Sequence, residues 1–294
     1  MKPAKKYASA GALRRALEDR LRQTANTEHV DLARLRRQVA FDRLLARLFR
    51  SDDVPWALKG GYAMELQLRV ARTTVDIDLT LPASASLSSE EAPATAAVRE
   101  MLQEAASLDL GDWFVYTVGA PMMDLDAAPY GGARYPIECR MDGRTFSRFH
   151  LDVGIGDVLI QPLQTIQGQD WLGFAEISPA EMRLISKEQQ VAEKLHAYTL
   201  PRSTLNSRVK DLVDLLLLIR TGEVRLAQLA KAVGMTFDRR KTHAIPSTLV
   251  PPPESWESQF RTLATECGLT SGMEDSFREV GSFLDQVLPP GKAK

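Results

Sequence analysis

Two short segments of the chain, residues 75–81 and 149–155, alternate strictly between apolar and polar side chains. A period of two predicts β-strands, each with one buried and one open face. The open faces carry Asp76 and Asp78 in the first strand and Asp152 in the second. Because neighbouring carboxylates make each other harder to ionise, we expect positive charge close to them. The predicted buried positions are Val75, Ile77 and Leu79 in the first strand and Phe149, Leu151, Val153 and Ile155 in the second.

The composition is that of an ordinary globular protein. With 294 residues, 44% of them hydrophobic and 26% charged, the chain is long enough for one large domain or two modest ones. Cys139 and Cys267 lie far apart without metal-type spacing, which favours a reduced, cytoplasmic protein. The most apolar stretch, residues 212–219, is interrupted by Asp214 and is too short to span a membrane, so we expect no membrane partner.

Positive charge is concentrated at the N-terminus. Residues 1–50 hold 13 Lys and Arg against 5 Asp and Glu, whereas the rest of the chain holds 24 against 33. This asymmetry fits an anionic partner such as RNA, and it fits a solvated, arginine-rich helix pair equally well. Neutralising Arg34, Arg36 and Arg37 would separate the two, because only RNA binding predicts a loss of salt dependence.

Helical and β-type patterns divide the chain into regions. We predict an α+β fold, in which a small mixed β-sheet lies between N-terminal helices and a C-terminal helical bundle. The expected domains are 1–52 (basic, helical), 53–178 (α/β core), 179–288 (helical) and 289–294 (disordered tail). The expected strands are 75–81, 113–118, 135–141 and 145–155, with an Asp142-Gly143 hairpin turn between the last two. The expected helices are two within 9–50, then 62–70, 96–106, 187–199, 204–220, 225–234, 256–266 (capped by Ser255) and 272–287, with loops at 82–95 and 236–253.

The paired aspartates suit a metal-assisted reaction on phosphate. Asp76 and Asp78 would lie about 7 Å apart on one face of a strand, an arrangement that suits two Mg²⁺ ions, or Mn²⁺, at a phosphoryl or nucleotidyl transfer site. Surface aspartate pairs on edge strands are common, so the pair alone is weak evidence. Asp152 is the favoured third carboxylate and Glu138 its rival. Alternatively, Asp152 pairs with one of the nearby arginines, Arg140, Arg144 or Arg148.

Lys59-Gly60-Gly61 precedes a short amphipathic segment that is predicted to be a helix. Glycines just before a helix allow backbone N–H groups to approach phosphate closely. The alternative is a simple turn beside a solvated lysine. The G-x4-GK[ST] phosphate-binding pattern is absent from the sequence.

Two later helices carry charges beside their apolar stripes. Lys187 and Lys194 are seven positions apart and share one helix face, where a fixed ammonium could hold a triphosphate or simply cover the core. Asp211 and Asp214 share a side of the next helix, and they could instead form local ion pairs with Arg208 and Lys210. His196 is expected to be a half-buried packing residue.

Three segments together resemble a known family. Lys59-Gly60-Gly61 followed by Arg72-Thr73-Thr74-Val75-Asp76-Ile77-Asp78-Leu79 resembles the first motif of the AbiEii-type (MenT-like) nucleotidyltransferase toxins, which belong to the polymerase-β-like superfamily. Residues 187–197 (KEQQVAEKLHA) resemble their lysine-helix motif and residues 208–215 (RVKDLVDL) their final motif. The three motifs occur in order within residues 56–220. The wider superfamily has Gly-Ser where this chain has Gly60-Gly61, so a serine contact to phosphate would have to come from elsewhere.

The resemblance implies the toxin of a bacterial toxin–antitoxin pair, which would transfer a nucleoside monophosphate from an NTP to the 3′ end of tRNA and block aminoacylation. It implies an NTP, tRNA and a cognate antitoxin as partners. Asp76 and Asp78 would hold the metals, and Asp152 would help to activate the attacking hydroxyl. The remaining expected site residues are Lys59, Gly60, Gly61, Arg72, Thr74 and Lys187 for the nucleotide, and Lys194 and Asp211 as catalytic residues; Thr74 is also a conceivable regulatory phosphorylation site.

Two other functions are compatible with the same residues. An enzyme of this superfamily could modify a hydroxyl of a protein or a small molecule. A protein that kept the fold could also bind a nucleotide or a partner without turnover, since fold alone does not fix function. The presence of Asp76, Asp78 and Lys194 together argues against a decayed site.

Overall fold

The structure is a computed structural model that describes residues 6–51, 53–68, 71–82, 94–125, 128–201, 208–220 and 223–289. It divides into two compact units, each described by itself. Unit 1 comprises residues 1–58, 74–156 and 165–184, and unit 2 comprises residues 59–73, 157–164 and 185–294. The predicted loop at 82–95, the start of the predicted helix at 204–220 and the predicted tail lie largely outside the described residues.

An eight-stranded sheet organises unit 1, in the order β3-β5-β6-β2-β1-β8-β7, with β4 also paired to β5. Parallel pairing of β2 with β6 and antiparallel pairing of β5 with β6 make it a mixed sheet, as predicted. The strands are β1 (Ala57–Lys59), β2 (Asp76–Leu81), β3 (Val115–Val118), β4 (Met123–Asp124), β5 (Gly132–Met141), β6 (Arg144–Ile155), β7 (Gln164–Gln167) and β8 (Glu181–Leu184).

The β5–β6 hairpin confirms the predicted turn. Asp142 and Gly143 join the two strands with φ angles of 55° and 67°. Both values lie in the left-handed region, which the right-handed twist of a tight hairpin requires and which Asp and Gly tolerate better than other residues. The local sequence at Asp142-Gly143 therefore suits the turn that joins the two strands.

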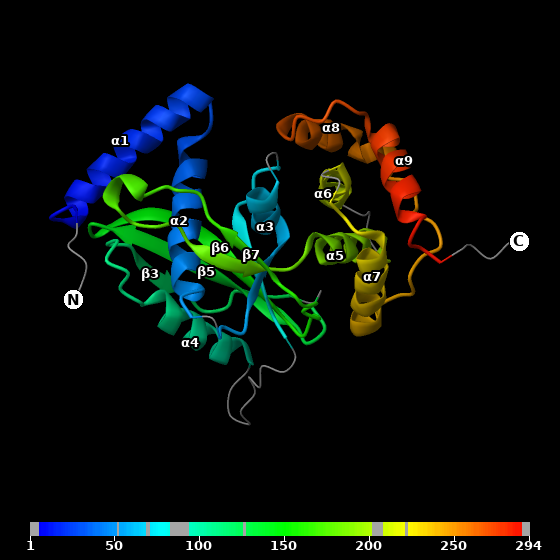
Figure 1. The fold of residues 1–294 in the computed structure, drawn as a ribbon, viewed down its shortest axis with the longest axis horizontal. Helices are drawn as coiled ribbons and strands as arrows, with labels where there is room; N and C mark the ends of the chain where they lie inside the picture. The colour runs from blue at the N-terminus through cyan, green and yellow to red at the C-terminus, as the bar shows by residue number, and fades with distance from the viewer. Residues whose placement is uncertain are drawn as a thin grey trace, which may run out of the picture. The chain divides into compact units, whose positions relative to one another are not determined.

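Three helices cover one face of this sheet: α1 (Ala10–Glu28), α2 (Leu32–Leu48) and α4 (Ala94–Ala106). Figure 1 shows α2 lying across strands β5 and β6. The ring of Phe41 on α2 meets Phe149 on β6 edge to face, 4.7 Å apart. The N-terminal helices, predicted as a separate region, thus complete the core of unit 1.

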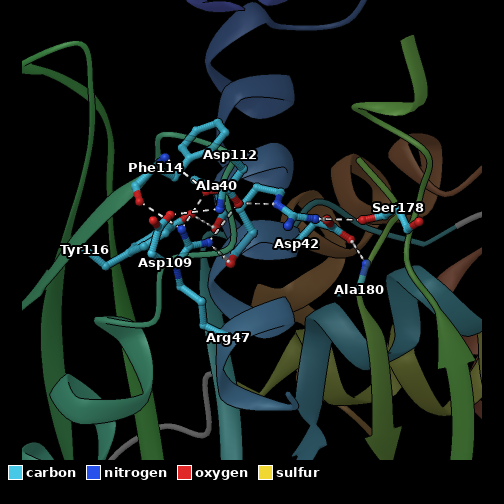
Figure 2. Close-up of polar contacts among 11 residues, drawn as sticks. Ala40, Asp42, Arg47, Asp109, Asp112, Phe114, Tyr116, Ser178 and Ala180 are labelled. Atoms are coloured by element: carbon cyan, nitrogen blue, oxygen red, sulfur yellow. Dashed lines mark hydrogen bonds and ion pairs between the residues drawn. The ribbon is translucent and has the colours of Figure 1, made fainter. Parts of the chain in front are cut away.

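A buried charge network ties α2 to the segment that leads into β3 (Figure 2). Arg47 donates to both carboxylate oxygens of Asp112, at 2.6 and 2.9 Å, and to the carbonyl of Phe114 at 2.8 Å. Arg43 adds a hydrogen bond to Asp112 at 2.8 Å. Burial would raise the pKa of Asp112, but the hydrogen bonds and charges of Arg47 and Arg43 outweigh it, so the pKa is lowered.

Unit 2 is helical (Figure 1). Its core is rich in leucine. Met64 and Leu68, at the end of its first helix, pack in the same core as Leu212 and Leu216. Its helices are α3 (Gly60–Gln67), α5 (Lys187–Thr199), α6 (Val209–Arg220), α7 (Leu226–Arg240), α8 (Glu257–Glu266) and α9 (Met273–Leu284).

The structure corrects several local predictions. Val75 is 55% exposed, because strand β2 begins one residue later, at Asp76. Helix α7 continues to Arg240, into the predicted 236–253 loop, because buried Thr236 and Phe237 extend its apolar stripe. Ser255 does not cap α8, since it lies inside a 3-10 turn, Glu254–Trp256, that leads directly into the helix. Strands β1, β4, β7 and β8 were not predicted, because two to four residues are too few to show a period.

Candidate active site: an acidic face and a buried cation cluster

Asp76, Asp78 and Asp152 lie together on the sheet face opposite the helices of unit 1. In the parallel pairing of β2 with β6, Asp78 is directly opposite Asp152, and Asp76 is opposite His150. The alternate residues Ile77, Leu79, Leu151 and Val153 are almost completely buried. The three carboxylates therefore share one face of two neighbouring strands, as the alternation predicted. We call these three residues the acidic face.

An arginine that was not predicted for the site lies on the acidic face. Arg134 is opposite Asp152 on β5, so that Arg134, Asp152 and Asp78 form a row across three strands. Its guanidinium donates to both oxygens of Asp152, each at 2.7 Å, and to Asp76 Oδ2 at 3.3 Å. The alternative that Asp152 pairs with an arginine is correct, but the arginine is Arg134 and not Arg140, Arg144 or Arg148.

Positive charge offsets part of the negative charge of this row. The hydrogen bonds that Arg134 donates to Asp152 raise the pKa of Arg134 above its ordinary value. The charges of Asp152, Asp76 and Asp78 add to this effect, against a smaller opposing cost of burial. On the other side of Asp76, Oδ1 lies 3.1 Å from His150 Nδ1. The side chains of Asp76 and Arg134 are 21% and 28% exposed, so the group remains open to a ligand.

Glu138, the rival third carboxylate, is occupied elsewhere. It lies opposite Arg148, one of its hydrogen-bond donors, at 2.8 Å, and its second donor is Thr145, also at 2.8 Å. These hydrogen bonds lower the pKa of Glu138. Since neither partner belongs to the acidic face, the pairing of strands favours Asp152 as its third carboxylate.

The acidic face offers the ligand type that Mg²⁺ prefers, namely one or two carboxylates with room for phosphate oxygens. As the side chains stand, the described part of the chain has no set of three or more His, Cys, Asp or Glu residues arranged to hold a metal ion. The predicted arrangement of the three carboxylates as a metal cage is therefore not seen in the described residues, and the guanidinium of Arg134 donates to both oxygens of Asp152. The carboxylate oxygens are the type of ligand that a divalent cation needs. In this structure the positive charge beside them is the guanidinium of Arg134.

In unit 2, Lys59 is a paired lysine and not a solvated one. Its ammonium lies 2.7 Å from Asp157 and 3.2 Å from Glu193, and Arg240 contacts the same two carboxylates. Burial lowers the pKa of Lys59, but the charges of Glu193 and Asp157 outweigh this effect and raise it. Gly60 follows with a φ of 68°, a left-handed conformation that favours glycine. The start of α3 is thus anchored by two ion pairs.

Four further residues form what we call the cation cluster: Arg72, Lys194, Asp211 and Asp214. Arg72 makes two hydrogen bonds of 2.9 Å to Asp214. Lys194 lies 2.7 Å from Asp214 and 3.1 Å from Asp211. Burial would lower the pKa of Lys194, but the two carboxylates raise it above the ordinary value. The predicted Lys210–Asp214 pair is replaced by these longer-range contacts, because Asp214 points into the core of unit 2, where its side chain is 1% exposed.

One carboxylate oxygen of Asp211 accepts no hydrogen bond from the described residues. Its Oδ1 accepts from Lys194, whereas Oδ2 is buried and has no hydrogen-bond partner among the described residues. Arg208 Nη1 lies 3.7 Å from Oδ2, which is the predicted helical pair. Buried carboxylate oxygens normally accept hydrogen bonds, so Oδ2 is an acceptor that a ligand could use.

The other predicted residues are placed as follows. Lys187 is 9% exposed and forms an ion pair with Glu223. Thr74 donates a hydrogen bond to the carbonyl of Asp76 at 3.2 Å, so it supports the start of β2. His196 is fully buried against the ring of Phe237, and burial together with Arg240 lowers its pKa to about 3. It stays neutral at ordinary pH, in agreement with a packing role.

Sequence reasoning missed several partners. Arg134 shares the open-face alternation of β5 with Glu138, and that alternation was a usable signal. By contrast, no local pattern connects Lys59 with Asp157, Glu193 and Arg240, which come from three separate segments of unit 2. Tertiary packing alone brings them together.

Part of the positive charge of residues 1–50 lies inside unit 1. Arg43 and Arg47 are buried in the network around Asp112, and Arg36 pairs with Glu18 at 2.6 Å. Arg14 donates to backbone carbonyls of the β5–β6 hairpin, including that of Met141 at 2.6 Å. These four arginines stabilise unit 1, and the choice between an RNA-binding surface and a solvated helix pair stays a prediction for the exposed cations.

The fold is that of a nucleotidyltransferase toxin. The chain is similar to MenT4, a nucleotidyltransferase toxin from Mycobacterium tuberculosis H37Rv, with a TM-score of 0.53 and 15% identity over 90% of this chain and 93% of that one. A second similar structure is JHP933 from Helicobacter pylori, with a TM-score of 0.46 and 14% identity over 86% and 91% of the two chains. No curated protein matches the sequence.

The family follows from the sequence itself. The family model described as nucleotidyl transferase AbiEii toxin, type IV toxin–antitoxin system, matches residues 43–281. Because the match covers well over half of the chain, the protein belongs to the AbiEii nucleotidyltransferase toxin family. The predicted resemblance and the predicted α+β fold are both confirmed. Within the described residues, no helix combines the length and the apolar character needed to cross a membrane.

Proposed function

We propose that this member of the AbiEii family transfers a nucleoside monophosphate from an NTP to the 3′ acceptor end of tRNA and thereby blocks aminoacylation and translation. The observation that carries the proposal is the acidic face, in which Asp78 and Asp152 occupy directly paired positions and Asp76 shares their side of the sheet. Carboxylates grouped in this way suit an in-line displacement at phosphorus. The family match supports the reaction class.

In the proposed reaction, the 3′-oxygen of the tRNA forms a bond to the α-phosphorus of the NTP. The bond between the α-phosphorus and the bridging oxygen breaks, and pyrophosphate leaves with that electron pair. Asp76 and Asp78, together with Asp152, would hold Mg²⁺, which supplies charge stabilisation when bound. Asp152 would also orient the attacking hydroxyl and help to remove its proton.

The residues of unit 2 would bind the nucleotide. Lys59, Arg72 and Lys194 would supply positive charge to the triphosphate, with Lys187, Gly60 and Gly61 as further contacts; Thr74 of unit 1 is the remaining proposed contact. Each of the four cations already has a carboxylate partner, so binding phosphate would require it to share or exchange that partner. The unsatisfied Oδ2 of Asp211 would accept a hydrogen bond from the ligand. As a toxin of a toxin–antitoxin pair, the protein would have a cognate antitoxin as partner.

The test is incubation of the purified protein with Mg²⁺ and each α-labelled NTP, in the presence of total tRNA or total protein, followed by mass spectrometry of the labelled species. Label at the 3′ end of tRNA is the expected result. Label on protein or on a small molecule would overturn the tRNA part of the proposal and keep the enzyme class. No transfer to any acceptor, with nucleotide binding retained, would overturn the enzymatic proposal.

A further inference from the structure

The acidic face already contains a cation, and it belongs to the protein. The guanidinium of Arg134 lies against Asp152 with the two-pronged geometry that makes arginine–carboxylate pairs strong. Its Nη2 also reaches Asp76 at 3.3 Å. One side chain therefore links carboxylates from β2 and β6, the two strands that carry the acidic face.

We propose that Arg134 is an internal counter-ion of the acidic face, which occupies the place of a divalent cation and competes with it for Asp152 and Asp76. The inference rests on the proposed function, because it concerns the same three carboxylates. Arg134 is accordingly a positioning residue: it fixes the carboxylates when no metal is bound, and it must release at least one oxygen of Asp152 before that carboxylate can bind a metal.

Two physical arguments support the competition. First, three carboxylates on adjacent positions repel one another, so the metal-free protein needs positive charge there. Second, the guanidinium donates to both oxygens of Asp152, each at 2.7 Å, so a divalent cation that bound the same oxygens would meet its positive charge at close range. The side chain is 28% exposed, which leaves room for Arg134 to swing away.

Matched variants test this inference without any assay of the reaction. Arg134→Gln removes the counter-ion. Arg148→Gln makes the same change of charge on the same sheet face, where Arg148 is 73% exposed and pairs with Glu138. Binding of Mn²⁺ is measured by electron paramagnetic resonance, and thermal unfolding is measured with EDTA and with saturating Mn²⁺.

We expect Arg134→Gln to bind Mn²⁺ about tenfold more tightly than the wild type, or better, because a competing unit charge within a few ångströms is removed. Arg148→Gln should bind as the wild type does. In EDTA the Arg134→Gln variant should melt below the wild type, and Mn²⁺ should narrow that gap. Arg134→Lys keeps the positive charge but lacks the planar guanidinium that donates to both oxygens of Asp152. It should bind Mn²⁺ with intermediate affinity. A residue with a merely structural role would not tighten metal binding when it is removed.

The outcomes separate the inference from the proposed function. If Asp78→Asn abolishes Mn²⁺ binding but Arg134→Gln binds no more tightly than the wild type, the metal site stands and the competition is overturned. If the wild type and Asp78→Asn bind Mn²⁺ equally, the acidic face is not the metal site, and the metal part of the proposed function fails. Should Arg134→Gln not fold even with Mn²⁺ present, equal affinities of Arg134→Lys and the wild type would overturn the competition.

Discussion

The acidic face of unit 1 and the cation cluster of unit 2 are both groups of opposite charges, but they differ in exposure. In the acidic face, Asp76 is 21% and Arg134 is 28% exposed. In the cation cluster, Asp214 is 1% exposed, and Arg72 and Lys194 are 12% and 17% exposed. Charges in the interior depend entirely on their partners, because water cannot replace a lost partner there. Charges at an open face can exchange partners at a lower cost than buried charges.

This difference predicts that the two groups respond in opposite ways to substitution. A change in the cation cluster should act first on stability. A change in the acidic face should act first on metal binding and on the reaction. The following substitutions test this contrast, from the largest expected effect to the smallest.

Asp214→Ala should lower the free energy of unfolding by about 3–5 kcal/mol. The substitution removes the carboxylate that Arg72 and Lys194 share, and both positive charges stay in a largely buried place. Urea unfolding measures this loss. The matched control is Asp275→Ala on α9, whose partner Arg278 is 69% exposed and which should cost less than about 1 kcal/mol. Equal losses in the two variants would remove the distinction between buried and exposed pairs.

Asp78→Asn should reduce nucleotidyl transfer about a hundredfold or more, because a metal-binding carboxylate at a phosphoryl transfer site is lost. The thermal stability in EDTA should change little, since one of three mutually repelling charges is removed. Initial rates with labelled NTP and tRNA give the comparison. Glu138→Gln, on the same sheet face but paired with Arg148, is the control and should keep its activity. A large loss of stability in Asp78→Asn would contradict the view of an open, exchangeable site.

Asp42 in unit 1 tests whether burial, and not the choice of unit, decides the response to pH. Burial raises the pKa of Asp42 to about 6, from 3.8, although Arg43 and the N–H of Ala180 partly offset it. The folded protein therefore binds this proton more tightly than the unfolded chain, and the contribution of Asp42 to stability falls as the pH rises through this range. Figure 2 shows Asp42 beside Ala180.

Asp42→Asn has no proton to lose at this position. Relative to the wild type, its free energy of unfolding should rise by about 2 kcal/mol between pH 4.5 and pH 7. Urea unfolding of both proteins at the two pH values measures the change. A difference that stays constant over this range would show that Asp42 does not titrate there.

Glu279→Gln should have the smallest effect. Glu279 and Arg220 form two hydrogen bonds, at 2.7 and 2.8 Å, between α9 and α6, but both side chains are more than a third exposed. We expect a loss below about 1 kcal/mol, which 1 M NaCl should largely abolish, because salt screens exposed pairs. A larger, salt-independent loss would mean that exposure is a poor guide to the strength of these pairs.

Much of the site could be predicted because its pattern is local. The alternation of residues 149–155 places Asp152 on the face opposite Leu151 and Val153, and the structure has that arrangement. The helix that bears Lys194 was likewise predicted with its bounds, Lys187–Thr199. Val75 marks the limit, because the period of a strand does not reveal the residue at which the strand begins.

The partners of the charged residues could not be predicted in the same way. Arg72 and Asp214 are separated by 142 positions, and Arg134 and Asp76 by 58. The sequence around Lys59 is compatible with a solvated lysine, whereas in the structure Lys59 forms ion pairs with Asp157 and Glu193. Ion pairs over such separations depend on which segments pack together, and sequence periodicity contains no information about that.

The sequence by itself determined the longer strands, the approximate positions of the helices, the shared face of Asp76 and Asp78, and the AbiEii family. These features depend on side-chain period and on short motifs, which act within a few residues of the chain. Only the tertiary structure decided that Asp152 lies opposite Asp78, that Arg134 takes both of its oxygens, and that the cations of unit 2 are neutralised. The physical reason is that strand pairing and helix packing join distant segments, and the charge of a group depends on its neighbours in space.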